Sequence, residues 1–152
     1  MDLRRRLRLS VPVVAAVVIV DQLTKWWALN ELDDGSTIEI LPTLELHLVY
    51  NSGFSFSTGS GNGQLIGVLV LALSGAMVWY IARATSVASV MLVAAILGGA
   101  IGNLGDRIFR AEDGVLSGEV VDFINVTWYA VFNIADAAVV CGAIAVVWVE
   151  WR

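Results

Sequence analysis

The chain has 152 residues, of which 58% are hydrophobic and 15% are charged, with a formal net charge of −5 at pH 7. Soluble domains are about 45–50% apolar and about 25% charged, so this composition indicates a single membrane-embedded domain. The only basic cluster is a short N-terminal segment, which argues against a nucleic-acid partner. One cysteine, Cys141, excludes an internal disulfide, and with the single histidine far away in sequence it makes no ligand set. We therefore expect no metal and no cofactor.

Four hydrophobic segments follow one another along the chain. They cover about residues 11–29, 65–81, 87–104 and 131–148. The second contains no charge, and its length of about 26 Å as a helix is close to the thickness of a hydrocarbon core. No small-residue cleavage site follows the first segment, so we interpret it as an uncleaved helix and not as a secretory signal. The predicted fold class is an all-α polytopic membrane protein with four transmembrane helices, forming one domain over residues 1–152.

The distribution of charge predicts the orientation of these helices. Arginines between residues 4 and 8 would hold the N-terminus in the cytoplasm, and Arg83 lies in the short link between the second and third segments. Four crossings return the C-terminus to the cytoplasm. The two outer loops, residues 30–64 and 105–130, would then be extracytoplasmic. Arg107 and Arg110 are exceptions to the charge rule in the second loop, which suggests a specific role.

The first outer loop has a pattern of its own. Apolar and polar residues alternate over residues 38–49, interrupted by Pro42, which predicts a half-buried strand or hairpin. We expect a small extracytoplasmic β-sheet cradle that rests on the bilayer surface. Residues 57–63 consist of Ser, Thr, Gly and Asn and predict a flexible turn before the second helix.

Two aspartates, Asp122 and Asp136, lie in apolar sequence beside the fourth hydrophobic segment. A carboxylate in hydrocarbon costs about 2.5–3.5 kcal/mol on insertion scales, which favours a functional role. A turn over residues 127–130 could bring the two together as a pair that shares one proton. Such a pair can take a proton from water and donate one to a carbonyl oxygen, as in aspartyl proteases. The alternative is a solvated loop residue, Asp122, and a lone buried acid, Asp136.

Further polar residues occur at helical spacing. Asp21 and Lys25 share a helix face, either as a structural ion pair or as part of a site. Asn103, Asp106 and Arg107 point one way if the third helix continues, either as a structural clamp or as groups that hold a substrate.

Two more spacings bear on packing and on the aspartates. Asn133 is three residues before Asp136 and could support it on one face of the fourth helix. Gly98 and Gly102 form a small-xxx-small spacing that permits close helix packing, within one chain or between two.

With these residues in order, the chain resembles the bacterial lipoprotein signal peptidases, also called type II signal peptidases. The resemblance covers nearly the whole chain. Its motifs are residues 21–25 (DQLTK), 51–57 (NSGFSFS), 98–107 (GGAIGNLGDR), 121–124 (VDFI) and 132–136 (FNIAD). The family usually has two small residues after the glycine of the second motif, where this chain has Phe54 and Ser55.

The resemblance implies an intramembrane aspartyl endopeptidase near the extracytoplasmic face of the bacterial cytoplasmic membrane. It would remove the signal peptide from a diacylglyceryl-modified prolipoprotein, cutting before the lipidated cysteine. Membrane lipid and globomycin-type inhibitors are the other implied partners. The family's catalytic pair matches Asp122 and Asp136. Its substrate-binding residues match Asn51, Gly53, Asn103, Arg107 and Asn133, and its supporting residues match Asp21, Lys25 and Asp106.

Two other classes remain open from the residues alone. A small transporter or proton-conducting protein would also use intramembrane Asp21, Lys25 and Asp136. Transporters tend to contain two matching halves with broken helices, and this sequence shows no such symmetry. A membrane scaffold without activity is the other alternative, and it would need Asp122 only for stability.

Overall fold

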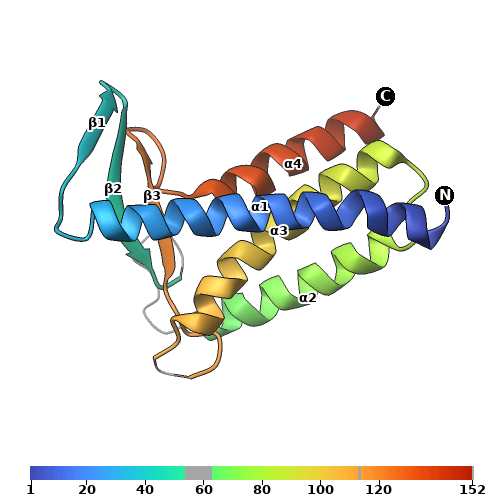
Figure 1. Ribbon diagram of the computed structural model, residues 1–152, viewed down its shortest axis with the longest axis horizontal. Helices are drawn as coiled ribbons and strands as arrows, with labels where there is room; N and C mark the ends of the chain where they lie inside the picture. The colour runs from blue at the N-terminus through green and yellow to red at the C-terminus, as the bar shows by residue number, and fades with distance from the viewer. Residues whose placement is uncertain (54–62, 113, 152) are drawn as a thin grey trace.

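The computed structural model describes residues 1–53, 63–112 and 114–151. This part of the chain forms four helices and a three-stranded sheet. The elements in chain order are α1 (Leu3–Glu31), β1 (Ile38–Leu41), β2 (Leu44–Asn51), α2 (Gly63–Ile81), α3 (Val87–Phe109), β3 (Val120–Val126) and α4 (Ile134–Glu150). Figure 1 shows the sheet at one end of the helices and both chain termini at the other end.

Three helices in the described part of the chain, α1, α2 and α3, are long and apolar enough to cross a membrane. The fourth helix, α4, has 17 residues. Several bounds differ from those expected. Helix α1 begins at Leu3, so the N-terminal arginines form its first turns, and α3 continues to Phe109 beyond its hydrophobic stretch. Helix α4 begins at Ile134 because Asn133 caps it.

The predicted hairpin over residues 38–49 is confirmed by β1 and β2, which pair antiparallel. Strand β2 is central, in the order β1-β2-β3, and also pairs antiparallel with β3. Strand β3 lies in a segment that we had expected to be an outer loop. Its first four residues are buried, since both of its faces are covered.

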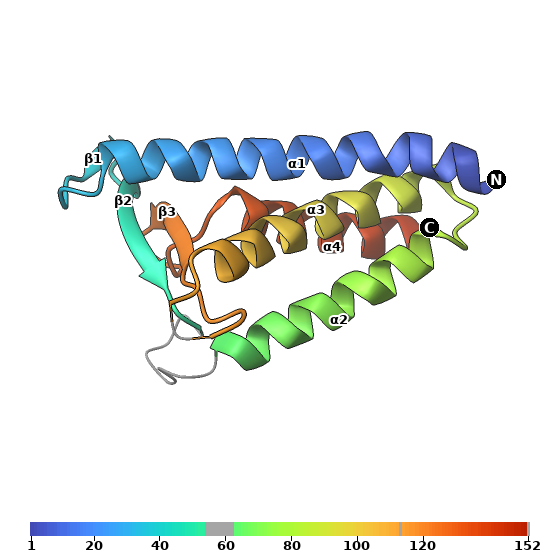
Figure 2. The same ribbon diagram turned by 60° about the horizontal axis from the view of Figure 1, so that its bottom comes forward.

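Helix α3 is the centre of the helical part and packs against α1, α2 and α4. Its glycines permit this close approach. A Cβ added to Gly98 would come within 2.8 Å of Val17 Cβ on α1, and one added to Gly99 would collide with the Ala135 carbonyl of α4. The small-residue stripe thus packs helices within one chain. Figure 2 shows α3 between α1 and α2, which diverge toward the sheet.

Candidate functional site

Asp122 lies on the buried part of β3, and only 1% of its surface is exposed. The β2–β3 register places Asn51 opposite Val120, close to this side chain. Asn51 Nδ2 donates to Asp122 Oδ2 at 2.9 Å, and Asn133 Nδ2 donates to Asp122 Oδ1 at 2.7 Å. Both carboxyl oxygens therefore accept a hydrogen bond although the group is removed from bulk water.

Asp136 lies in the first turn of α4, where the helix dipole favours a negative charge. It forms a capping box with Asn133, whose side chain accepts from Asp136 N at 2.9 Å and whose backbone N–H donates to Asp136 Oδ2 at 3.2 Å. Asn103 Nδ2 donates to Asp136 Oδ1 at 2.7 Å. Asn133 does support Asp136, but as the residue that caps the helix and not as a neighbour on its face.

Asn133 joins the two aspartates. Its side-chain amide binds Asp122 and its backbone N–H binds Asp136. The chain returns after β3 through a turn in which Tyr129 N–H donates to the Val126 carbonyl at 3.0 Å. Phe132 then pairs antiparallel with Ile124. This short reversal brings together two carboxyls that are fourteen positions apart in the sequence.

Lys25 is fully buried at the junction of α1 and α3. Its Nζ lies 2.9 Å from Asp21 Oδ2 and 2.9 Å from Asp106 Oδ2, and it donates to Asn103 Oδ1 at 2.8 Å. The bond to Asn103 directs that residue's amide nitrogen toward Asp136. A buried ammonium between two carboxylates and an amide oxygen has all three of its donors satisfied.

The two carboxylates that bind Lys25 also hold the segments that carry the aspartates. Asp21 Oδ1 accepts from Ala135 N–H at 3.0 Å, at the start of α4. Asp106 Oδ2 accepts from Val121 N–H at 3.2 Å, one residue before Asp122. The ion cluster therefore sets the positions of both β3 and α4.

The environment of Asp122 changes its acidity. Burial raises the pKa of Asp122 from its ordinary value of 3.8 to about 6. The hydrogen bond from Asn51 opposes this rise because it stabilises the charged form, and the negative charge of Asp136 adds to it. A carboxyl with a pKa near 6 exchanges a proton at little cost close to neutral pH, which general acid–base chemistry requires.

Arg107 and Gly53 border the same region. Arg107 is buried, its Nη1 donates to the Gly118 carbonyl at 3.4 Å, and its charge interacts with Asp122 and Asp136. Gly53 N–H donates to Asn51 Oδ1 at 3.1 Å, which turns the Asn51 amide nitrogen toward Asp122. All ten predicted site residues thus lie in one connected region at the sheet end of the helices.

One contributor was missed from the sequence. Gln22 Nε2 lies 3.2 Å from Asp21 Oδ2, 3.3 Å from Asp106 Oδ1 and 3.1 Å from the Gly102 carbonyl. A polar side chain beside Asp21 in an apolar helix was the available signal.

Within residues 1–53, 63–112 and 114–151, no group of three His, Cys, Asp or Glu could hold a metal. Phe54, Ser55 and the predicted turn over residues 57–63 lie, apart from Gly63 of α2, outside the described residues.

The family model described as signal peptidase (SPase) II matches residues 13–152 of the chain. The chain belongs to the signal peptidase II family. As a signal peptidase II it is a hydrolase that cleaves peptide bonds. It is 44% identical to the lipoprotein signal peptidase of Bifidobacterium adolescentis, over 95% of this chain and 79% of that protein. It is 41% identical to the lipoprotein signal peptidase of Mycolicibacterium smegmatis, over 95% of this chain and 61% of that protein.

Solved structures resemble this signal peptidase II in fold. A bacterial membrane enzyme determined by the in meso method at 1.9 Å resolution has a TM-score of 0.80 and 27% identity, covering 94% of this chain and 92% of that one. A second one, at 2.3 Å resolution, has a TM-score of 0.77 and 26% identity, covering 93% and 87%.

Proposed function

We propose that this chain removes signal peptides from diacylglyceryl-modified prolipoproteins as an intramembrane aspartyl endopeptidase, cutting before the lipidated cysteine. Asp122 and Asp136 are the catalytic pair of this proposal. The observation that carries it is the shared contact with Asn133, which binds one carboxyl through its side chain and the other through its backbone. The lipoprotein signal peptidases at 41–44% identity supply the substrate class.

The pair would hold one proton between two carboxyls, because two nearby charges in a partly dry site cannot both persist. The ionised carboxyl takes a proton from water as the water oxygen forms a bond to the scissile carbonyl carbon. The protonated carboxyl donates to the carbonyl oxygen. The C–N bond then breaks, the amine leaves with the proton taken from water, and the other proton returns to the pair.

The remaining polar residues would serve the pair in two ways. Asn51, Asn103 and Arg107 keep side-chain N–H groups that can meet the carbonyl oxygens of an extended substrate, while Gly53 and Asn133, whose N–H groups bind within the site, would line it. Asp21, Lys25 and Asp106 would support the aspartate pair, because their cluster anchors β3 and the start of α4. Globomycin-type inhibitors would occupy this same pocket and compete with the substrate.

The orientation proposed for the protein places the site near the extracytoplasmic face. Both termini lie at the end of the helices opposite the sheet (Figure 1), and the exposed arginines of α1 gather at that end. Helix α4 would be the fourth span, since 17 residues extend about 26 Å. A substrate anchored by its lipid in the outer leaflet would then reach the site by lateral diffusion.

The test is cleavage of a purified diacylglyceryl precursor in detergent, with and without globomycin. We expect Asp122→Asn and Asp136→Asn each to reduce the rate by at least about 10²-fold, since each removes one proton-transferring group. The matched control is Asp34→Asn, an exposed aspartate in the loop between α1 and β1. Cleavage at the normal rate by either site variant would refute the carboxyl pair. Proton flux in proteoliposomes without cleavage would support the transporter instead.

A further inference from the structure

An apolar groove runs between α1 and α2 at the end of the helices opposite the sheet. It encloses about 510 Å³, and its walls and floor are mainly aliphatic, including Leu7, Val14 and Val18 of α1, Val78 and Ile81 of α2, and Leu97 of α3. We call it the α1–α2 groove. It lies away from Asp122 and Asp136, and no step of the proposed peptidase chemistry uses it.

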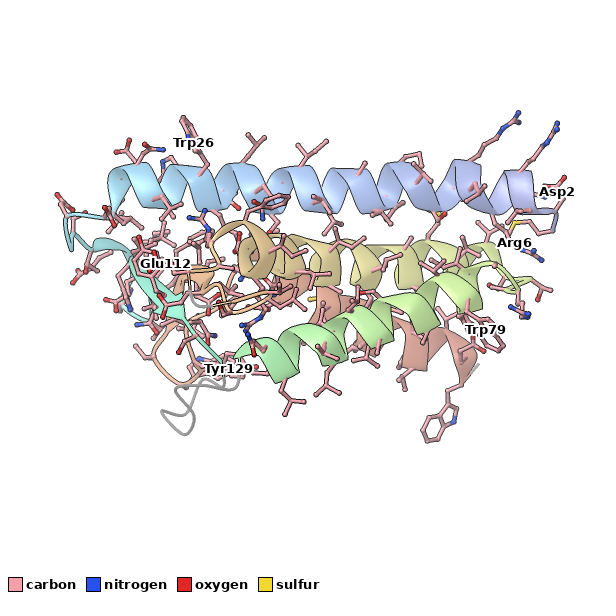
Figure 3. The ribbon with its side chains drawn as sticks, turned by 90° about the horizontal axis from the view of Figure 1, so that it is seen from below. Asp2, Arg6, Trp26, Trp79, Glu112 and Tyr129 are labelled. Atoms are coloured by element: carbon pink, nitrogen blue, oxygen red, sulfur yellow. The ribbon has the colours of Figure 1, made fainter. Side chains whose placement is uncertain are left out.

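The mouth of the α1–α2 groove carries a fixed positive charge. Arg6 lines the groove, and its guanidinium donates to the Ala82 carbonyl at 2.7 Å and to the Ala84 carbonyl at 2.9 Å. Figure 3 shows Arg6 extending from α1 toward the link between α2 and α3. These two bonds hold the group in place and leave donors of its five N–H groups for a further partner.

Arg4 adds a second charge on the same side of α1. It is exposed, and its spacing from Leu7 and Val11 places it on the helix face that lines the groove. Arg5 is equally exposed, but it shares the opposite face with Ala16. The groove therefore has an apolar interior, which suits a lipid tail, and a cationic rim, which suits an anionic headgroup.

The depth of the groove fits one leaflet. From Arg6 at its mouth to Val18 at its far end, α1 rises about 18 Å, and half of a hydrocarbon core is about 15 Å, so Arg6 lies near the level of the lipid headgroups. In the orientation proposed above, this half of the protein lies in the cytoplasmic leaflet. We propose that the α1–α2 groove binds one anionic glycerophospholipid of that leaflet. One acyl chain lies between α1 and α2, and the phosphate lies against Arg6 and Arg4.

Charge argues against a signal peptide as the occupant. The N-terminal region of a signal peptide is positively charged and would meet the arginines of α1 together with Arg83, which follows α2. Like charges repel, whereas each arginine near a membrane surface attracts anionic lipid. The rim thus selects a lipid phosphate.

The test is native mass spectrometry of the full chain, released from detergent that contains phosphatidylglycerol or phosphatidylcholine with the same acyl chains. We expect one phosphatidylglycerol to be retained in preference to phosphatidylcholine. Arg4→Gln should weaken its retention roughly fivefold, while Arg5→Gln should leave it unchanged. Ala15→Phe should abolish retention because Ala15 lines the groove, and Ala16→Phe, on the opposite face of α1, should not.

Three results would overturn the proposal. They are equal retention of the two lipids, equal effects within either matched pair of variants, and displacement of phosphatidylglycerol by a signal peptide. The Arg4 and Arg5 pair decides the question even if Ala15→Phe does not fold. Cleavage of a lipid-modified precursor by the same variants is measured in parallel. Failure of the lipid proposal with cleavage intact leaves the proposed peptidase function standing.

Discussion

Asp122→Asn should change how the stability of the protein depends on pH. The Asp122 carboxyl is buried and its pKa is raised to about 6. A raised carboxyl pKa means that the folded state binds the proton more tightly than the unfolded state. The stabilisation from this group is therefore complete below its unfolded pKa of 3.8 and is lost as the pH rises through about 6. Asparagine cannot ionise and escapes this loss.

The magnitude follows from the two pKa values. A rise from 3.8 to about 6 corresponds to roughly 3 kcal/mol of unfolding free energy. Asparagine also brings a penalty that does not depend on pH. Asn51 and Asn133 each donate to one oxygen of Asp122, and the new amide presents only one oxygen, which costs about 1–3 kcal/mol. The unfolding free energy of Asp122→Asn minus that of the wild type should therefore rise by roughly 3 kcal/mol from pH 4 to pH 8, whatever its value at pH 4.

The assay is reversible unfolding of both proteins in mixed micelles at several pH values between 4 and 8. Asp34→Asn is the control, because the backbone N–H of Ser36 lowers the pKa of exposed Asp34, so its stabilisation is lost as the pH falls. The unfolding free energy of Asp34→Asn minus that of the wild type should therefore fall slightly as the pH rises. A difference for Asp122→Asn that stays flat across this pH range would refute the argument from burial.

Three further variants, one of them with a matched control, test the surroundings of the aspartates. Lys25→Met should lower the unfolding free energy by about 3–5 kcal/mol, because it leaves two buried carboxylates without their cation; chemical unfolding measures this. Gly99→Ala should destabilise the protein because its Cβ meets the backbone of α4, whereas Gly75→Ala, which meets nothing, should stabilise it by up to about 1 kcal/mol in thermal unfolding. Asn51→Ala should move the acidic limb of the pH–rate profile to higher pH, because it removes a hydrogen bond that lowers the pKa of Asp122. An acidic limb that stays at the same pH would contradict this role of Asn51.

Local chemistry in the sequence was enough to predict several parts of this protein. Long apolar segments predicted the helices, since a helix satisfies its own backbone in hydrocarbon. The alternation of apolar and polar residues over 38–49, interrupted by Pro42, predicted the hairpin, which β1 and β2 confirm. Asp21 and Lys25 are one helical turn apart, so their ion pair is a matter of helix geometry alone and is present at 2.9 Å.

The tertiary structure decided which distant residues meet. β3 was not predicted, because its residues are buried on both faces and show no alternation. Asn133 was placed on a helix face, but its role as the cap of α4 depends on where that helix begins. The contact of Asn133 with Asp122 requires the pairing of Ile124 with Phe132 and the packing of α3 against α4. Such contacts between remote segments arise from tertiary packing, which no short stretch of sequence determines by itself.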